Sequence, residues 1–408
     1  MRSSTSQLRR ALRFLICAIL LAGIGCSVAA EILLQETRLD DGIPQSLIGS
    51  LDVSIRGLLS SQPIPGLLVG FRFGTGETGI LAYGHSDRET EAPMSVDGAF
   101  YIGSTTKAMT AVAVMQAADR GEIDLDVSVR DYLPACPAAW EAVTLRHLLA
   151  HTSGIPAYIL TEEGQALRWT SGTVTLSQIL DIIAERPMDF APGAGWNYTN
   201  TNFFLLGHVL ESALGVDYAD IMATNLFGPL GLARTSYDER SRPAGLATAY
   251  YLPDEPAAQF EIYPLPNVSL VHGAGGISSG VDDLLGFLPG VFAGDLLSDA
   301  TLAAMTDPAN TALSLPTAEK YGLGCMVWRE GRDGLPSRVG HLGTIHGHLT
   351  LMQYFPEHGL SLVLYSNSYD LLRALNPSRP AGALRAPTAL HVDIADILLE
   401  YLGWGDGT

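Results

Sequence analysis

Lysine is almost absent from this chain: among 408 residues only Lys107 and Lys320 occur. Charged residues of all kinds make up 16% of the chain, and 43 acidic against 24 basic side chains give a formal net charge of −19. Binding to nucleic acid or to an anionic membrane surface depends on lysine and arginine, so we expect neither as a partner. The composition favours a small molecule or a peptide as the substrate.

Cysteine is also scarce, and its four positions are Cys17, Cys26, Cys136 and Cys325. Nothing in the sequence brings Cys136 and Cys325 together, and we prefer two separate buried thiols to a disulfide. No group of residues has the spacing of a metal site. His147 and His151 lie four apart in an expected helix, but without an intervening glutamate they indicate packing or surface histidines rather than zinc ligands. We therefore expect neither a metal nor a cofactor.

Long hydrophobic runs are missing too. The apolar stretch from Phe14 to Ala22 is too short to span a membrane, and it stands between several arginines and the small residues Val28-Ala29-Ala30. This pattern predicts a signal peptide over residues 1–30 and export to the periplasm or the medium. Lipidation at Cys26, or retention of the segment as an anchor, are the alternatives. Without lipidation we expect no stable association with a membrane.

The first of the two lysines follows Ser104 by three positions. An apolar, alanine-rich run that predicts a helix begins here and ends near Gly121, and residues three apart lie on one helical face. A serine hydroxyl becomes a nucleophile when a neighbouring base takes its proton, and Lys107 can be that base if burial and the helix N-terminus favour a neutral amine. The alternative is a serine that caps the helix, followed by a lysine in solvent.

Periodicity along the chain indicates an α+β fold. Helical patterns cover 46–60, 145–149, 176–184, 202–214, 217–227, 281–292, 298–305 and 389–402, and strand patterns cover 66–73, 79–83, 100–102, 323–329, 348–355 and 360–366. Strands near both ends with helices between them predict one antiparallel sheet assembled from distant segments, with a helical insertion in the middle. We expect residues 31–110 and 266–408 to form the sheet domain and 111–265 the helical domain.

Two further motifs supply groups that a reactive serine needs. Tyr198-Thr199-Asn200 sits in a turn before a helix, where a tyrosine could move a proton and an asparagine could orient the lysine or a substrate amide. Tyr365-Ser366-Asn367 repeats the pattern at the end of an apolar run and fits the close of a strand better. His341-Leu342-Gly343 could place a histidine that donates to a carboxylate or an oxyanion, beside a glycine that lets a substrate backbone approach.

Several long stretches resemble the serine β-lactamase-like, penicillin-binding family, which includes class C β-lactamases, DD-carboxypeptidases, D-aminopeptidases and related esterases. The resemblance covers most of residues 50–402. It is carried by Gly103-Ser104-Thr105-Thr106-Lys107, Leu145-Arg146-His147-Leu148-Leu149-Ala150-His151-Thr152-Ser153-Gly154, Tyr198-Thr199-Asn200, Pro229-Leu230-Gly231-Leu232 and Gly275-Gly276-Ile277-Ser278-Ser279. The three family motifs then fall in order at Ser104-x-x-Lys107, Tyr198-x-Asn200 and His341-x-Gly343, which makes Tyr365 the decoy.

The resemblance implies an α+β fold, with an antiparallel sheet flanked by helices beside an all-helical domain and the site in the cleft between them. It also implies a role for each motif. Ser104 is expected to attack a carbonyl and form an acyl-enzyme, with Lys107 and Tyr198 acting together as base and then acid. Asn200, His341, Gly343 and Thr344 are the expected substrate-binding residues. The backbone N–H groups of Ser104 and Thr344 would form the oxyanion hole.

One departure from the family bears on the substrate. Class C β-lactamases carry lysine where this chain has His341, and the histidine form is closer to exported DD-peptidases and some esterases. Leu342 also replaces a small or hydroxylated residue that binds a substrate carboxylate. One of Arg329, Arg332 and Arg338 would then have to supply that anchor.

Three hypotheses follow. The first is an exported serine hydrolase acting on D-Ala-D-Ala-type peptides or small amides. The second is a carboxylesterase or weak β-lactamase with the same site. The third is a non-catalytic penicillin-binding sensor or scaffold, which the presence of all three motifs disfavours.

Overall fold

An antiparallel sheet forms the centre of the computed structural model, which describes residues 33–60, 64–238, 242–253, 259–294, 296–308, 320–329, 334–368 and 388–404. Within these residues the sheet has nine strands in the order β1-β3-β2-β13-β12-β11-β10-β9, with β4 paired to β3. The predicted signal peptide and Cys26 lie outside the described residues. No helix among the described residues is long and apolar enough to cross a membrane.

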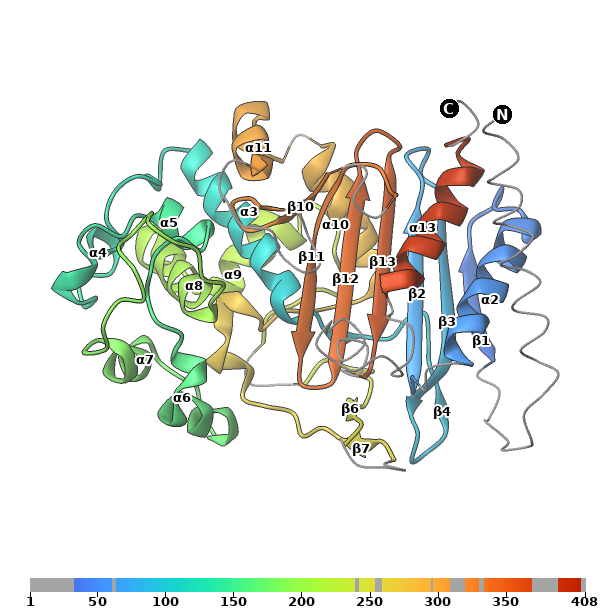
Figure 1. Ribbon diagram of the computed structural model, residues 1–408, viewed down its shortest axis with the longest axis horizontal. Helices are drawn as coiled ribbons and strands as arrows, with labels where there is room; N and C mark the ends of the chain where they lie inside the picture. The colour runs from blue at the N-terminus through green and yellow to red at the C-terminus, as the bar shows by residue number, and fades with distance from the viewer. Residues whose placement is uncertain are drawn as a thin grey trace. The chain divides into compact units, whose positions relative to one another are not determined.

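The sheet joins segments from both ends of the chain (Figure 1). Its strands are β1 (Leu34–Leu39), β2 (Gly66–Arg72), β3 (Thr78–Asp87), β4 (Ala92–Pro93), β9 (Lys320–Tyr321), β10 (Met326–Trp328), β11 (Arg338–Ile345), β12 (His348–Phe355) and β13 (Leu360–Ser366). β2 pairs with β13 in a register that sets Val69 opposite Leu364. This confirms the predicted antiparallel sheet built from distant parts of the sequence.

Helices cover both faces of the sheet. On one face α2 (Gln45–Leu59) packs against α13 (Thr388–Tyr401), and on the other α10 (Val281–Phe292) packs against β2, β12 and β13 (Figure 1). Because both faces are covered, β12 and β13 are buried along their whole length. The sequence of β13 is accordingly mostly apolar, whereas β12 also buries the polar residues His348, Thr350 and Gln353.

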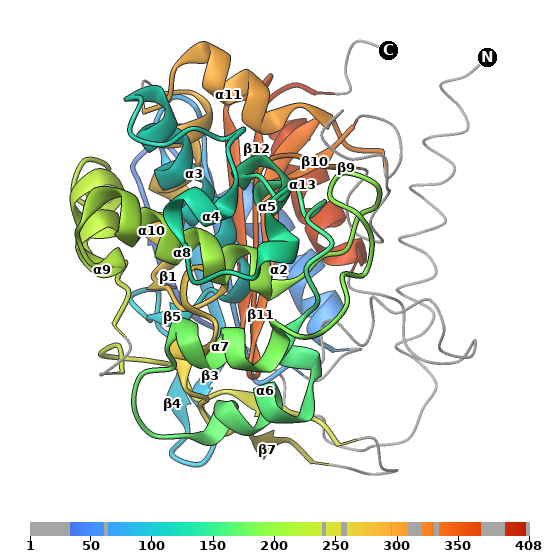
Figure 2. The ribbon, with the colours of Figure 1, turned by 90° about the vertical axis from the view of Figure 1, so that its left-hand side faces the viewer.

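A group of helices lies beside the sheet, and Figure 2 faces it. Its members are α4 (Val129–Tyr132), α5 (Leu145–Leu149), α6 (Glu162–Ala166), α7 (Leu176–Ile183), α8 (Asn200–Leu214) and α9 (Tyr218–Met222). α3 (Thr106–Asp119) packs against α8 on one side and β11 on the other. A helix enclosed in this way is apolar all round, and every residue of α3 from Thr106 to Ala117 is buried.

Local signals set the ends of several helices where the sequence predicted them. Thr144 caps α5 and Thr175 caps α7, each through its side chain and a capping box. Gly215 ends α8 in a left-handed conformation with φ 68°. α11 (Asp299–Thr306) and α10 also match their predicted spans closely.

Some predictions need correction. The expected strand over 323–329 contains only Met326–Trp328, because Gly324 has φ +85° and turns the chain just before it. β1 and β11 were not among the predicted strands. The segment expected as one helix over 217–227 is α9 followed by a π-helical turn from Ala223 to Phe227. The division into a sheet domain and a helical domain stays a prediction.

Cys136 and Cys325 are both buried free thiols, which confirms the expectation that they do not pair. Burial raises the pKa of each thiol to about 12, so neither is a thiolate at neutral pH.

Candidate active site

Ser104 lies in a 3₁₀ turn, η1 (Gly103–Thr105), that runs directly into α3, and Lys107 is in the first turn of that helix. The serine is partly exposed, whereas the Lys107 side chain is fully buried. Ser104 is not the N-cap of α3, because Thr105 holds that position and makes no side-chain cap. The alternative of a capping serine followed by a solvated lysine is therefore wrong.

The Lys107 amine has three close oxygen atoms. Its Nζ lies 2.7 Å from Asn200 Oδ1, 2.8 Å from the Ala274 carbonyl and 3.1 Å from Ser104 Oγ. A neutral amine has two N–H groups and one lone pair, so donating to the two carbonyl oxygens leaves the lone pair directed at the serine hydroxyl.

Burial favours this protonation state. Desolvation lowers the pKa of Lys107 well below its usual value, and the N-terminal end of α3 also disfavours a cation. No carboxylate among the described residues forms an ion pair with Lys107. The geometry and the electrostatics thus both fit a lysine that accepts the proton of Ser104.

Tyr198 lies beside this pair. Its ring centroid is 4.9 Å from Lys107 Nζ, and its hydroxyl oxygen is buried without a well-aligned hydrogen bond in the described part of the chain. Burial raises the pKa of Tyr198, and interaction with the Ser104 hydroxyl offsets part of that rise. A protonated phenol near the nucleophile can pass a proton to a leaving group.

His341 is arranged differently from the expectation. Its Nδ1 lies 2.7 Å from the Leu342 carbonyl oxygen and its Nε2 lies 3.0 Å from the Tyr321 hydroxyl. Nδ1 therefore donates and Nε2 accepts from the tyrosine. Burial lowers the pKa of His341 to about 3. The ring is neutral with both nitrogens occupied, so direct donation to a substrate would require it to exchange a partner.

Two glycines bring the nucleophile turn against β11. A Cβ on Gly343 would lie 1.9 Å from the Ile102 carbonyl oxygen, and a Cβ on Gly103 would lie 2.6 Å from the Thr344 carbonyl carbon. Gly103 also has φ +53°, which disfavours any side chain. The partner that approaches Gly343 most closely is thus this chain's own backbone. The contact aligns Ser104 with the strand that carries the third motif.

A pocket of about 310 Å³ opens at Ser104. It is lined by Ser104, Ile159, Arg168, Asn200, Tyr263, Val271, Ala274, Gly275, Thr344, Ile345 and His346. Ser104, Asn200 and Thr344 therefore face one space, and the assignment of an oxyanion hole to the Ser104 and Thr344 amides stays a prediction. Three residues of the site were not predicted from the sequence: Arg168, Ala274 and Tyr321, the partner of His341. Only Ala274 could have been found, because it directly precedes the family segment Gly275–Ser279.

Of the three arginines suggested as carboxylate anchors, the two that the structure describes, Arg329 and Arg338, do not line this pocket. Arg338 is buried between the rings of Trp328 and Phe355. Arg329 is exposed, and Arg332 lies outside the described residues.

The decoy motif is part of the core. Tyr365 is fully buried in β13, stacks on Phe100 at 3.7 Å between ring centroids and donates to His348 Nδ1 at 2.7 Å. Asn367 donates to two backbone carbonyls. These contacts confirm the interpretation of Tyr365 as the close of a strand.

The histidine pair of the α5 region has a packing role. His147 completes the capping box with Thr144, whereas His151 lies beyond the end of α5 with φ +59°. His151 is buried 4.4 Å from the Tyr198 ring, centroid to centroid. The two side chains do not share a helical face, so the zinc interpretation is wrong.

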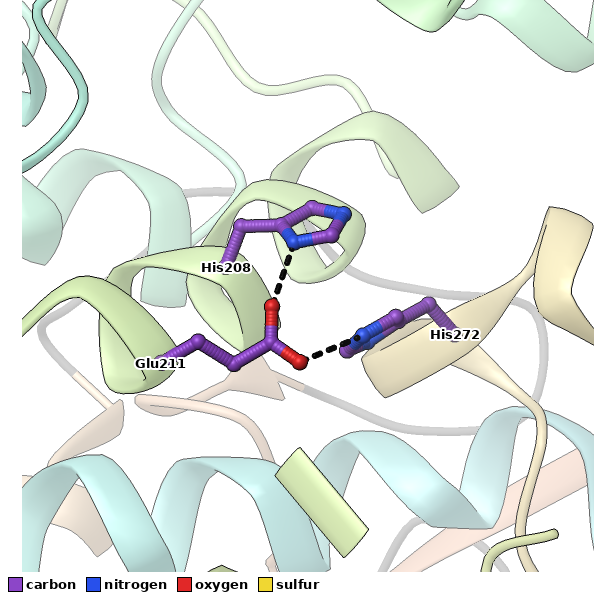
Figure 3. Close-up of side chains that lie close together, drawn as sticks. All are labelled: His208, Glu211 and His272. Atoms are coloured by element: carbon purple, nitrogen blue, oxygen red, sulfur yellow. Dashed lines mark hydrogen bonds and ion pairs between the residues drawn. The ribbon is translucent and has the colours of Figure 1, made fainter. Parts of the chain in front are cut away.

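One other cluster contains potential metal ligands within the described residues: His208, Glu211 and His272 (Figure 3). The His208 Nδ1–Glu211 Oε2 distance of 2.6 Å is that of a hydrogen bond, and the carboxylate also accepts from the Tyr218 backbone N–H and lies 3.5 Å from His272 Nε2. Because the Glu211 carboxylate is already shared among three donors, we interpret the cluster as a structural hydrogen-bond network rather than a metal site. It holds the 3₁₀ turn His272–Ala274, whose Ala274 carbonyl receives the Lys107 amine.

A partly exposed serine, a buried lysine directed at it and a pocket beside them define a serine hydrolase. The sequence model of the beta-lactamase family, described as "Beta-lactamase", matches residues 51–384, and the chain belongs to this family. This confirms the resemblance noted in the sequence, its α+β fold and its class of enzyme.

Relatives within the family differ in their described activities. The chain is 27% identical over 306 residues to penicillin-binding protein 4* of Bacillus subtilis, covering 71% of this chain and 65% of that protein, which is less than two thirds. It is 28% identical over 329 residues to esterase EstB of Burkholderia gladioli, covering 70% of this chain and 82% of the esterase.

A similar fold occurs in the crystal structure of D-amino acid amidase from Ochrobactrum anthropi SV3 complexed with D-phenylalanine. The TM-score is 0.75 at 22% identity, and the match covers 87% of this chain and 99% of the amidase.

Proposed function

We propose that this protein is an exported serine hydrolase that acts through an acyl-enzyme on D-Ala-D-Ala-type peptides or similar small amides. The observation that carries the proposal is the position of the buried Lys107 amine, whose Nζ lies within hydrogen-bond distance of Ser104 Oγ, Asn200 Oδ1 and the Ala274 carbonyl oxygen. Relatives named penicillin-binding protein and a structural neighbour named D-amino acid amidase support this class of substrate.

The proposed reaction starts at the scissile carbonyl. Ser104 Oγ bonds to the carbonyl carbon as its proton moves to Lys107 Nζ, and the negative charge on the oxygen is held by the Ser104 and Thr344 amides. The C–N bond then breaks as Tyr198 delivers its proton to the leaving amine and takes up the proton held by Lys107, which yields the acyl-enzyme with both groups neutral again. Water completes the cycle by the reverse proton path. The aromatic and backbone groups around Lys107 keep bulk water from its amine.

Two measurements test the proposal. Release of D-alanine from an N-acylated D-Ala-D-Ala peptide is compared with that of a Ser104→Ala control, and intact-mass spectrometry tests for a covalent adduct on Ser104 after exposure to benzylpenicillin. We expect turnover and an adduct in the wild-type protein alone. Peptide turnover no faster than in the control would remove the peptidase proposal, even if an adduct forms.

A carboxylesterase or weak β-lactamase using the same site is the second candidate. It is favoured by the apolar lining residues Ile159, Val271 and Ile345 and by exposed Leu160 and Trp169, which adjoin lining residues in sequence. These apolar side chains could contact the acyl chain of an ester substrate. A kcat/KM for p-nitrophenyl acetate above that for the peptide would favour the esterase, and turnover of nitrocefin would favour the β-lactamase.

Export is proposed from the sequence of residues 1–30. Mass analysis of the protein recovered from a secreting host would show a mature chain starting near Glu31. A mass that includes a lipid on Cys26 would instead place the protein on a membrane.

A further inference from the structure

Arg168 is a lining residue of the pocket that contains Ser104, and it is the only lining side chain with a fixed charge in the described part of the chain. It belongs to a 3₁₀ turn, η4 (Leu167–Trp169), between α6 and α7. The surface as a whole is strongly acidic, with a net charge of −19. A cation inside the substrate pocket therefore opposes the general sign of the molecule.

This guanidinium has no acidic partner among the described residues. Its Nε is buried without a hydrogen bond, and it takes part in none of the ion pairs found there, whereas the nearby Arg186 pairs with Glu163. A buried donor without an acceptor costs free energy. A bound anion would supply the missing acceptors, since the planar fork of arginine matches a carboxylate through two parallel hydrogen bonds.

The backbone around Arg168 is held in place. The Asn267 N–H donates to the Arg168 carbonyl at 2.9 Å, and the Asn267 side chain donates to the carbonyls of Thr170 and Gly172 at 3.1 and 2.6 Å. The chain then continues from Asn267 to Val271 and Ala274 on the pocket wall. The turn that carries Arg168 is thus tied by hydrogen bonds to the segment that also positions Lys107.

We infer that Arg168 binds the terminal carboxylate of the substrate's leaving group. The inference rests on the proposed function and makes it narrower, because it favours peptides that end in a free D-amino acid over their amides or neutral esters. The apolar lining residues Ile159 and Val271 would contact the side chain of that amino acid. Arg168 would then be the anchor that the sequence analysis sought in Arg329, Arg332 or Arg338.

The test uses an acid and amide pair of otherwise identical ligands. The inhibition constants of N-acetyl-D-Ala-D-Ala and of its C-terminal amide are measured against hydrolysis of p-nitrophenyl acetate, so binding is observed whether or not the peptide is turned over. The wild-type protein, Arg168→Gln, Arg168→Lys and Arg186→Gln are compared. Arg186→Gln is the matched control, since it also removes one positive charge, but from a surface pair.

We expect the wild-type protein to bind the acid more tightly than the amide. Arg168→Gln should weaken binding of the acid by about 10- to 100-fold, as loss of a charge-assisted pair does, and change the amide less than about twofold. Arg168→Lys should keep part of the preference for the acid over the amide, and Arg186→Gln should keep the whole preference. The melting temperature of Arg168→Gln should not fall, because the variant removes an unpaired buried donor.

Two outcomes would overturn the inference: equal binding of acid and amide by the wild-type protein, or an equal loss of both in Arg168→Gln. The proposed peptidase function is judged separately by release of D-alanine. If the wild-type protein releases no D-alanine but its preference for the acid disappears in Arg168→Gln, the role of Arg168 as the carboxylate anchor would stand. The proposed peptidase function would then be wrong.

Discussion

Replacing Asn200 by aspartate tests whether Lys107 works as a neutral base. Asn200 Oδ1 lies 2.7 Å from the lysine Nζ, so the substitution sets a carboxylate beside the amine with little change of shape. A charge pair at that distance is worth about 1.5 kcal/mol at the dielectric constant of water and about 6 kcal/mol at an effective value of 20. The pKa of Lys107 would rise by about one to four units.

The sign of the effect on rate follows from which form is active. The neutral amine accepts the serine proton, so kcat/KM rises with pH through the pKa of Lys107 and then levels off. Because burial lowers that pKa, we expect the wild-type rate on p-nitrophenyl acetate to rise much less between pH 7 and 9 than the roughly 100-fold expected for an ordinary lysine. In Asn200→Asp the rate at pH 7 should fall, by about tenfold for each unit by which the pKa comes to exceed 7, and recover as the pH increases.

The assay is kcat/KM from pH 6 to 9, with Asn200→Ala as the control that removes the acceptor without adding a charge. Asn200 is the first residue of α8, where an acidic side chain is favourable, so Asn200→Asp should fold normally. A wild-type rate that rises about 100-fold between pH 7 and 9 would refute the reasoning, because it would mean that Lys107 has an ordinary pKa near 10.4.

Three other variants test separate parts of the site. Ser104→Ala should abolish turnover and the benzylpenicillin adduct while changing the free energy of unfolding by less than about 1 kcal/mol, since the side chain is partly exposed; a larger loss of stability would show a structural role. Gly343→Ala should lose activity and about 2 kcal/mol or more of the free energy of unfolding in urea, because its Cβ would overlap the Ile102 carbonyl. The control is Gly49→Ala, which places a methyl group in open space on α2 and should not destabilise the protein. Burial alone would raise the pKa of Glu211, but hydrogen bonds with His208 and His272 outweigh it and lower that pKa well below its usual value. The ionised Glu211 therefore stabilises the fold above pH of about 4.3 and loses this effect as the pH falls. Glu211→Gln should thus be less stable than the wild-type protein at pH 7, and the difference should narrow towards pH 3; a constant difference would contradict the assignment.

Local patterns in the sequence were enough to predict most helices and the central strands. Capping threonines, a terminal glycine and apolar periodicity act within one element, so they can be recognised without its neighbours. β11 escaped prediction because its sequence includes Arg338, Gly340 and Gly343, which are poor strand formers. Its strand conformation depends on pairing with β10 and β12. The polar strand β1 likewise depends on pairing with β3 at the sheet edge.

The site was predictable where residues close in sequence act together, as Ser104 and Lys107 do. It was not predictable where the partner comes from a distant segment. Tyr321 satisfies His341 from a separate strand, and that contact changes the histidine from a free donor to an occupied one. Arg168 had no sequence signal at all, because an arginine in a short helical turn is ordinarily a surface residue.

The charges around the pocket follow a common pattern. Burial favours neutral Lys107. Burial also lowers the pKa of His341 and of His346 to about 3, and the positive charge of Arg168 acts in the same direction on His346. The two imidazoles are thus neutral at pH 7 and the Lys107 amine is biased towards its neutral form, while the guanidinium of Arg168 keeps its charge because arginine does not lose its proton in proteins. An anionic group of the substrate entering this pocket would therefore be drawn to Arg168 and away from the amine that must stay uncharged. Binding and proton transfer are then served by two different basic residues, and neither compromises the other.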